Sequence, residues 1–226
     1  MKLYRFPLLL LLVMAGLNCA PANGPIPSEP VIMPLAVGNE WIGRINRYDS
    51  HAKLDSTWLD TLRVLRSEVA DGETWYYANT PVIYGPDTLY AWFTNRPDGL
   101  YTRDIEDYPE DHGKVYRCAK YPARPGDICA TFDSTFDTLG NGLYDGVSVD
   151  TTNLRFNAPA GIFNCDVYRG FYYNRDEDEI MSGYAPGKYL APGVGLIAFG
   201  YFQADGSHDS ASGGDHTWQL VRAILH

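Results

Sequence analysis

The chain has 226 residues, of which 45% are hydrophobic and 14% are aromatic. This is enough apolar material for the core of one large domain, a simpler expectation than two small ones. Acidic residues outnumber basic residues by 28 to 18, and the formal net charge is −10 at pH 7. Because no basic cluster offsets this charge, we expect no nucleic-acid partner.

Residues 1–22 have the pattern of a signal peptide. Lys2 and Arg5 give a positive start, and residues 6–17 are almost entirely apolar. This run is too short to span the roughly 30 Å hydrocarbon core of a bilayer. The sequence therefore predicts export, with an extracytoplasmic location for the mature chain.

The end of this leader can be read in two ways. Cys19, in GLNCA, lies where a lipoprotein has its acylated first residue, whereas Ala20-Pro21-Ala22 fits the small-residue rule for ordinary secretion. Lipidation at Cys19 is the favoured alternative, because a cysteine so close to the apolar run is otherwise rare. The protein would then be a periplasmic or outer-membrane-anchored lipoprotein, with an N-terminal lipid as its membrane contact, and otherwise a secreted protein.

The next segment, residues 23–34, is rich in proline. Proline favours extended backbone and lacks an N–H donor, so we expect an extended leader rather than a packed element. Residues 35–226 are predicted to form a single β domain.

The first predicted strands are joined by tight turns. Residues 41–48 alternate as one strand, and residues 57–69 are rich in threonine, valine and leucine and lead through Asp71-Gly72 into Trp75, Tyr76 and Tyr77. This is the pattern of a β-hairpin, although the leucine spacing in 57–69 also fits a helix. A second hairpin joins residues 88–94 to 100–103 through a turn at residues 96–99.

The later segments predicted to be strands are bounded by Gly, Pro, Asp or Asn: residues 114–120, 128–132, 146–152, 163–173, 194–202 and 217–225. Many short strands at close spacing predict an all-β, mainly antiparallel fold. We expect a single curved meander sheet, closing into a half-barrel or a sandwich, with little helix.

The cysteines beyond Cys19 suggest one disulfide. Cys118 and Cys129 flank a Pro- and Gly-containing turn, and we expect them to face each other across a hairpin and form a disulfide. Cys165 is then left over in an alternating strand. We interpret it as a buried free thiol, because no histidine lies near it in the sequence to act as a general base.

Three polar segments are candidates for metal binding. His208, Asp209, Asp215 and His216 share one loop and offer zinc ligands, but the Gly and Ser residues of that loop favour a simple connection between strands. The acidic runs at residues 104–112 and 175–179 lack the ligand rhythm of a calcium loop and are interpreted as solvated. No metal or other cofactor is expected.

The stretch YLAPGVGLIAF, residues 189–199, resembles a phosphate-binding loop at first sight. A dinucleotide loop, however, needs Gly-x-Gly-x-x-Gly between a strand and a helix, and no helix follows here. We interpret Pro192-Gly193 as a turn that introduces a strand. Gly195 is expected where that strand bends or where a neighbour packs closely.

Four landmarks resemble a recurrent pattern in uncharacterised bacterial secreted proteins and lipoproteins: PLAVGNEW at 34–41, AGIFNCDVY at 160–168, YLAPGVGLI at 189–197 and TWQLV at 217–221. The resemblance implies an all-β extracytoplasmic domain akin to the half-barrels of lipoprotein carriers that shelter acyl chains. It implies no catalytic residues.

These observations favour a non-enzymatic binding or structural domain of the cell envelope, with a groove for an apolar ligand. Its partners would be an apolar small molecule or an envelope protein. The alternative is a carbohydrate-binding domain or a carbohydrate-active hydrolase, which would need two carboxylates converging beside aromatic platforms. The sequence contains neither Gly-x-Ser-x-Gly nor His-Glu-x-x-His, the motifs of serine hydrolases and zinc proteases.

Overall fold

The computed structural model describes residues 31–49, 51–80, 89–103, 114–131, 146–174, 179–202, 207 and 216–226. Within these ranges the regular elements are all β-strands, which form one 12-stranded antiparallel sheet. The strands are β1 (Glu40–Tyr48), β2 (Leu54–Ala70), β3 (Glu73–Thr80), β4 (Leu89–Arg96), β5 (Gly99–Arg103), β6 (Val115–Lys120), β7 (Ile128–Thr131), β8 (Gly146–Ala158), β9 (Gly161–Asn174), β10 (Glu179–Ala191), β11 (Gly195–Gly200) and β12 (His216–Ile224). The predicted all-β antiparallel fold is confirmed.

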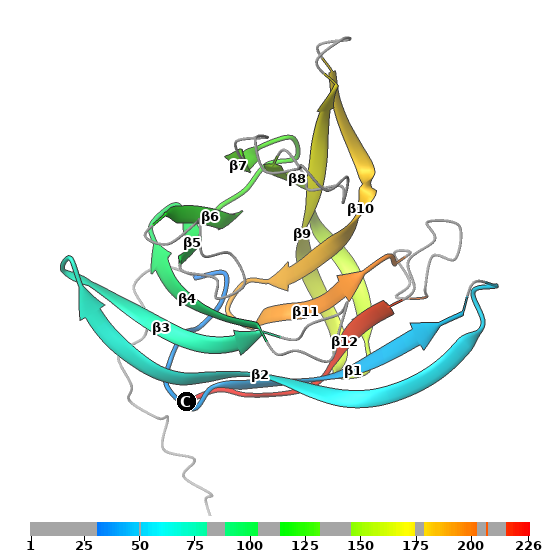
Figure 1. Cartoon of the computed structure of the whole chain (residues 1–226), viewed down its shortest axis with the longest axis horizontal. Coiled ribbons are helices and arrows are strands. Elements are labelled where there is room, and N and C mark those ends of the chain that lie inside the picture. Colours follow the sequence, from blue (N-terminus) through cyan, green and yellow to red (C-terminus); the bar gives the residue numbers. More distant parts are fainter. Residues whose placement is uncertain are drawn as a thin grey trace, which may run out of the picture.

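The sheet is a meander closed on itself. Its strand order is β6-β5-β4-β3-β2-β1-β12-β11-β10-β9-β8-β7, so the first and last strands of the chain pair in the middle. The two outer strands, β6 and β7, are consecutive in the chain and lie near each other, which curls the sheet into a nearly closed barrel (Figure 1). The predicted curved meander is therefore correct, and it closes further than a half-barrel.

Alternating burial explains the strands around the chain termini. In β1 the side chains of Trp41 and Ile45 are completely buried, while their neighbours along the strand are more exposed. Ile45 is the direct cross-strand partner of Trp218 on β12, which is also fully buried. The burial of these large side chains provides the driving force that holds the chain ends together.

Two expectations about segment boundaries are wrong. Residues 31–34, predicted as part of an unpacked leader, are packed: Ile32 and Met33 are buried, and Gly193 N donates to Val31 O at 2.7 Å. Burial of these apolar side chains favours packing of the segment in spite of its proline content.

The second boundary is the end of β8, which continues past residue 152 to Ala158. Phe156 is buried there against Tyr189 and Phe202, with ring centroids 4.7 and 5.4 Å away.

The YLAPGVGLIAF stretch forms the β10–β11 connection, as predicted. β10 ends at Ala191, Val194 N donates to Ala191 O at 3.0 Å, and β11 begins at Gly195. No part of β10 itself was predicted as a strand. Gly and Pro residues interrupt its alternation, and its pairing with β9 shifts register between Ser182 and Gly187.

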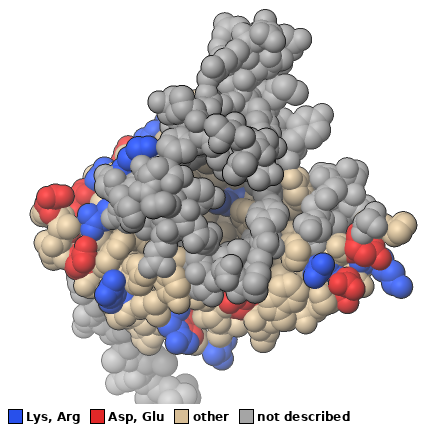
Figure 2. Space-filling model, viewed as in Figure 1, with Lys and Arg blue, Asp and Glu red and all other residues tan. Residues whose placement is uncertain are grey.

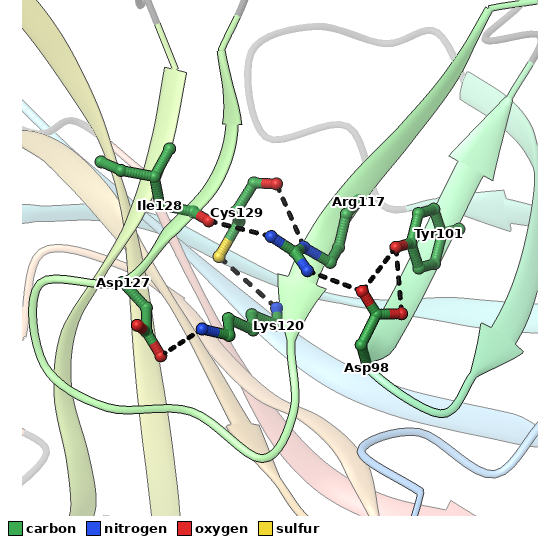
Figure 3. Close-up of polar contacts among 7 residues, drawn as sticks. All are labelled: Asp98, Tyr101, Arg117, Lys120, Asp127, Ile128 and Cys129. Carbon is green, nitrogen blue, oxygen red and sulfur yellow. Dashed lines mark hydrogen bonds and ion pairs between the residues drawn. The ribbon is translucent and has the colours of Figure 1, made fainter.

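The two outer strands meet at a junction that we call the seam, formed by Arg117 and Lys120 of β6 and by residues 127–129 at the start of β7. The Arg117 guanidinium donates to Cys129 O at 3.2 Å and to Ile128 O at 3.1 Å (Figure 3). It also donates to Asp98 Oδ2 at 2.7 Å. A charged side chain thus supplies donors to the edge carbonyls of β7, which lie at the end of the sheet order.

The predicted disulfide and its hairpin are corrected by this arrangement. Cys118 and Cys129 are free thiols in the structure. Cys118 Sγ donates to Leu100 O on β5 at 3.3 Å, whereas Cys129 Sγ accepts from Lys120 N at 3.4 Å. The turn between the two cysteines was recognised, but it joins the two edges of the sheet instead of two ladder-paired strands.

A substitution at Gly195 tests how tightly the entrance to β11 is packed. Its φ is +98°, and a Cβ there would lie 2.9 Å from Met33 Cγ and 3.0 Å from Trp41 Nε1. Gly193 also has a positive φ, +76°, but a Cβ there would meet nothing within 4 Å. We expect Gly195→Ala to lower the free energy of unfolding by about 2–4 kcal/mol and Gly193→Ala by about 1 kcal/mol. Urea denaturation measures both, and equal losses would show that backbone strain alone acts at residue 195.

Arg117→Met tests the seam. Removing the donors to two carbonyls and the partner of Asp98 should lower the free energy of unfolding by about 2 kcal/mol. Arg47→Met is the matched control, because Arg47 forms a 3.7 Å ion pair with Asp55 in which both side chains are more than half exposed. There the loss should stay below about 0.5 kcal/mol. Similar urea midpoints for the two variants would contradict a structural role for the seam.

Candidate ligand-binding site

A cavity of about 510 Å³, open to solvent, lies beside the β10–β11 turn. It is lined by Tyr121, Asn153, Ile162, Phe163, Asn164, Asp166, Ala191, Pro192 and Val194. These residues come from the loop between β6 and β7, from β8, from β9 and from the YLAPGVGLIAF stretch. Most of the lining side chains are apolar, with one carboxylate and two carboxamides among them, which is a common composition for a small-molecule site.

The cavity exists because β9 extends beyond the end of β10, the strand that pairs with it on this side. Ile162, Asn164 and Asp166 alternate along β9 and so point to the same side of the sheet. The ladder between β9 and β10 ends with the pair Asp166 and Leu190, so the residues before Asp166 have no partner in β10. The chain beyond Leu190 turns through Pro192 to Val194 and provides the opposite wall.

Asp166 is the one charged residue of this lining. Its side chain is buried, with 8% of the residue exposed, and its Oδ1 accepts from Asn153 N at 3.0 Å. Burial raises the pKa of the carboxyl above its usual value, and the hydrogen bond from Asn153 acts against this. Among the residues that the structure describes, Oδ2 has no hydrogen-bond partner.

Asn153 explains part of the role of Asp166. Its φ is +55°, in the left-handed region that asparagine tolerates better than most residues. It lies where the pairing of β8 with β9 shifts register, between Thr151 and Leu154. One oxygen of Asp166 therefore fastens a β-bulge, and the other remains available to the cavity.

Tyr168 connects the cavity to the seam. It lies two residues after Asp166 on the same side of β9, is fully buried, and donates from its hydroxyl to Lys120 O at 2.7 Å. Burial raises the pKa of this hydroxyl well above its usual value, so it is a neutral donor. The β9 wall of the cavity is thus held to β6 across the barrel.

Cys165, next to Asp166, has no nucleophilic role. It is completely buried and free, as predicted. Burial raises the pKa of its thiol to about 12, with a smaller contribution from Asp166. The reactive thiolate is therefore absent near neutral pH.

Aromatic side chains on β3 and β4 are engaged with arginines. Arg66 lies 4.5 Å from the ring centre of Tyr77 and 5.3 Å from that of Trp92. Arg103 lies 4.4 Å from the ring centre of Trp75. These cation–π contacts stabilise the sheet and use ring faces that a stacking sugar would need.

The candidate metal ligands are not brought together by the described structure. His208, Asp209 and Asp215 lie outside the described residues, as do Cys19, the acidic run at 104–112 and most of the run at 175–179. His216 lies on β12 with its ring centre 6.1 Å from that of Trp58. In the described part of the chain, no group of three or more His, Cys, Asp or Glu residues is arranged to hold a metal ion. No helix in that part has the length and hydropathy to cross a membrane.

Asp166 and Asn153 were not among the residues predicted to form a site. In GIFNCDVYRG the apolar alternation runs through Phe163, Cys165 and Val167, so Asp166 falls with Asn164 among the positions expected to face solvent. The partner that gives this aspartate a role, Asn153, lies on the preceding strand. Its position depends on a register shift that single-sequence patterns do not reveal.

No family model and no curated protein matches the chain. Two crystal structures show a distant likeness. One is of a protein from Bacteroides fragilis assigned as exported, with a YmcC-like fold: identity is 18%, the TM-score is 0.47, and the match covers 87% of this chain and 100% of that one. The other is of a protein from Parabacteroides distasonis assigned as a lipoprotein: identity is 15%, the TM-score is 0.41, and coverage is 86% and 99%.

Asp166→Asn tests the cost of burying this carboxylate. The pKa of the Asp166 carboxyl is higher in the folded protein than its ordinary value of 3.8, so ionising this carboxyl destabilises the fold. This loss of stability is present at neutral pH and disappears below pH 3.8. Asparagine keeps an acceptor for Asn153 without the charge. We expect Asp166→Asn to unfold at higher urea than the parent protein at pH 7, with the difference shrinking towards pH 3.5.

The control is Asp55→Asn, which removes an exposed carboxylate and should change stability by less than about 0.5 kcal/mol at either pH. A destabilised Asp166→Asn variant at pH 7 would show that Asp166 is purely structural.

Proposed function

We propose that the protein is a non-enzymatic, extracytoplasmic binding protein whose ligand occupies the cavity beside Asp166. The observation that carries this proposal is the second carboxylate oxygen of Asp166, which borders the cavity without a hydrogen-bond partner among the described residues. A largely buried carboxylate with one oxygen left free beside a cavity is a frequent sign of a functional group.

The cavity lining defines the ligand class. Ile162 and Val194 provide apolar contact, and Asp166 accepts a hydrogen bond from a hydroxyl or an amine. The ligand is therefore a small amphipathic molecule that carries at least one such donor. This keeps the apolar contact expected from the sequence and adds a polar anchor to it.

A carbohydrate is the second candidate. Asn153 and Asn164 add carboxamides beside Asp166, and Tyr121 is an aromatic residue of the same lining, a combination that suits hydroxyl groups and the apolar face of a sugar. Binding is favoured over hydrolysis, because the described lining contains one carboxylate and glycosidases generally use two.

The location follows from residues 1–22. A positive start, a short apolar run and Cys19 or Ala20-Pro21-Ala22 at its end support export of the chain. Acylation at Cys19 would place the binding domain at a membrane surface.

NMR titration of the isotope-labelled protein tests this function. The probes are a fatty alcohol, an amino alcohol and a panel of monosaccharides. We expect one class to shift the backbone amides of Asn153, Asn164 and Val194, and we expect its affinity to fall about tenfold in Asp166→Asn.

In Asp55→Asn the same affinity should be unchanged. The proposal fails if no probe shifts these amides, or if Asp166→Asn binds as tightly as the parent protein.

A further inference from the structure

Lys188 has an unusual position on β10. It is exposed, although Gly187 and Tyr189 on either side of it are buried. Its direct cross-strand partners are Tyr168 on β9 and Phe199 on β11. A cation is therefore placed between two aromatic residues on the same face of the sheet.

That face continues as a largely apolar row of direct cross-strand partners, which we call the aromatic row: Val149, Tyr168, Lys188, Phe199, Trp218, Ile45 and Trp58. Direct partners share one side of a sheet, so the ammonium group lies on the same side as these rings. Val149, Tyr168, Trp218 and Ile45 are buried, whereas Lys188 and Trp58 remain accessible.

This side of β9 and β10 faces the barrel interior. The Tyr168 hydroxyl reaches Lys120 O on β6, which lies at the opposite end of the strand order. Lys188 also interacts with β6. Burial raises the pKa of the Cys118 thiol on β6 to about 11, and the positive charge of Lys188 acts against that rise. Basic side-chain atoms are also visible inside a hollow at the centre of the space-filling view (Figure 2).

Lys188 has no carboxylate partner in the described part of the chain. Other basic residues of the barrel do have one: Arg96 pairs with Glu73, Arg103 with Glu68, and Lys120 with Asp127. Asp166 is not its partner either, because it lies opposite Leu190 in the ladder, two residues further along. An accessible ammonium group beside aromatic side chains has the chemistry to bind an anion that carries an apolar body.

We propose that the barrel interior contains a binding site for an amphipathic anion, with Lys188 binding the anionic group and Phe199, its direct cross-strand partner, contacting the apolar body. The anionic group is a carboxylate, sulfonate or phosphate. This site goes beyond the cavity at Asp166, and its test does not require that the cavity bind a ligand.

Two fluorescent probes with nearly the same apolar body test the site. Anilinonaphthalene sulfonate is an anion, and N-phenylnaphthylamine is neutral. In Lys188→Met the dissociation constant of the sulfonate should rise about tenfold, while that of the neutral probe should change by less than about twofold. Lys188→Arg keeps the charge and should retain sulfonate binding.

Lys53→Met is the matched control, because Lys53 is an exposed lysine before β2 and should leave both dissociation constants unchanged. The proposal is overturned if the sulfonate does not bind the parent protein, if Lys188→Met binds it equally well, or if both probes lose affinity to the same extent. The last result would indicate lost packing in place of a lost charge. Urea denaturation of each variant confirms that it is folded.

Discussion

The closure of the barrel depends on the Arg117 guanidinium at the seam. The strands between β6 and β7 in the sheet order have a neighbour on each side, whereas these two end the sheet. Arg117 bridges them by donating to two carbonyls of β7 (Figure 3). It also donates to the carboxylate of Asp98, in the turn between β4 and β5. A side chain with several donors in a fixed plane is well suited to this task, and lysine would not replace it fully.

The candidate sites depend on this closure. The Tyr168 hydroxyl is bound to the backbone of Lys120, and Tyr121 follows directly as part of the cavity lining. If β6 moved away from β7, Tyr121 would leave the cavity and the face that carries Lys188 would be exposed to bulk solvent. Side-chain closure also needs fewer bonds than a full ladder, so the seam is a local weak point of an otherwise continuous sheet.

Asp166 has a structural role in the sheet and, in the proposed function, a role in ligand binding. Its bond to Asn153 holds the register shift between β8 and β9, and further along β8 Phe156 packs against Tyr189 and Phe202. An uncharged acceptor could make the same bond without the penalty of burying a carboxylate. In the proposed function, a ligand of the cavity accounts for the aspartate at this position.

Local patterns in the sequence determined much of the fold. Alternating residues around Trp41, the Asp71-Gly72 turn and the Pro192-Gly193 turn predict strands and connections correctly, because these signals act over a few residues. They failed for β10, whose Gly and Pro residues hide its alternation, and for residues 31–34, whose burial depends on contacts with distant strands.

By itself, the sequence determined that the chain is an antiparallel β meander, that Cys165 is buried, and that YLAPGVGLIAF is a strand entrance. Only the tertiary structure decided that β6 and β7 close the barrel through Arg117, that Cys118 and Cys129 remain free thiols there, and that Asp166 and Lys188 face accessible space. The physical reason is that register and curvature, which bring these residues to their partners, are set by packing between strands far apart in the chain.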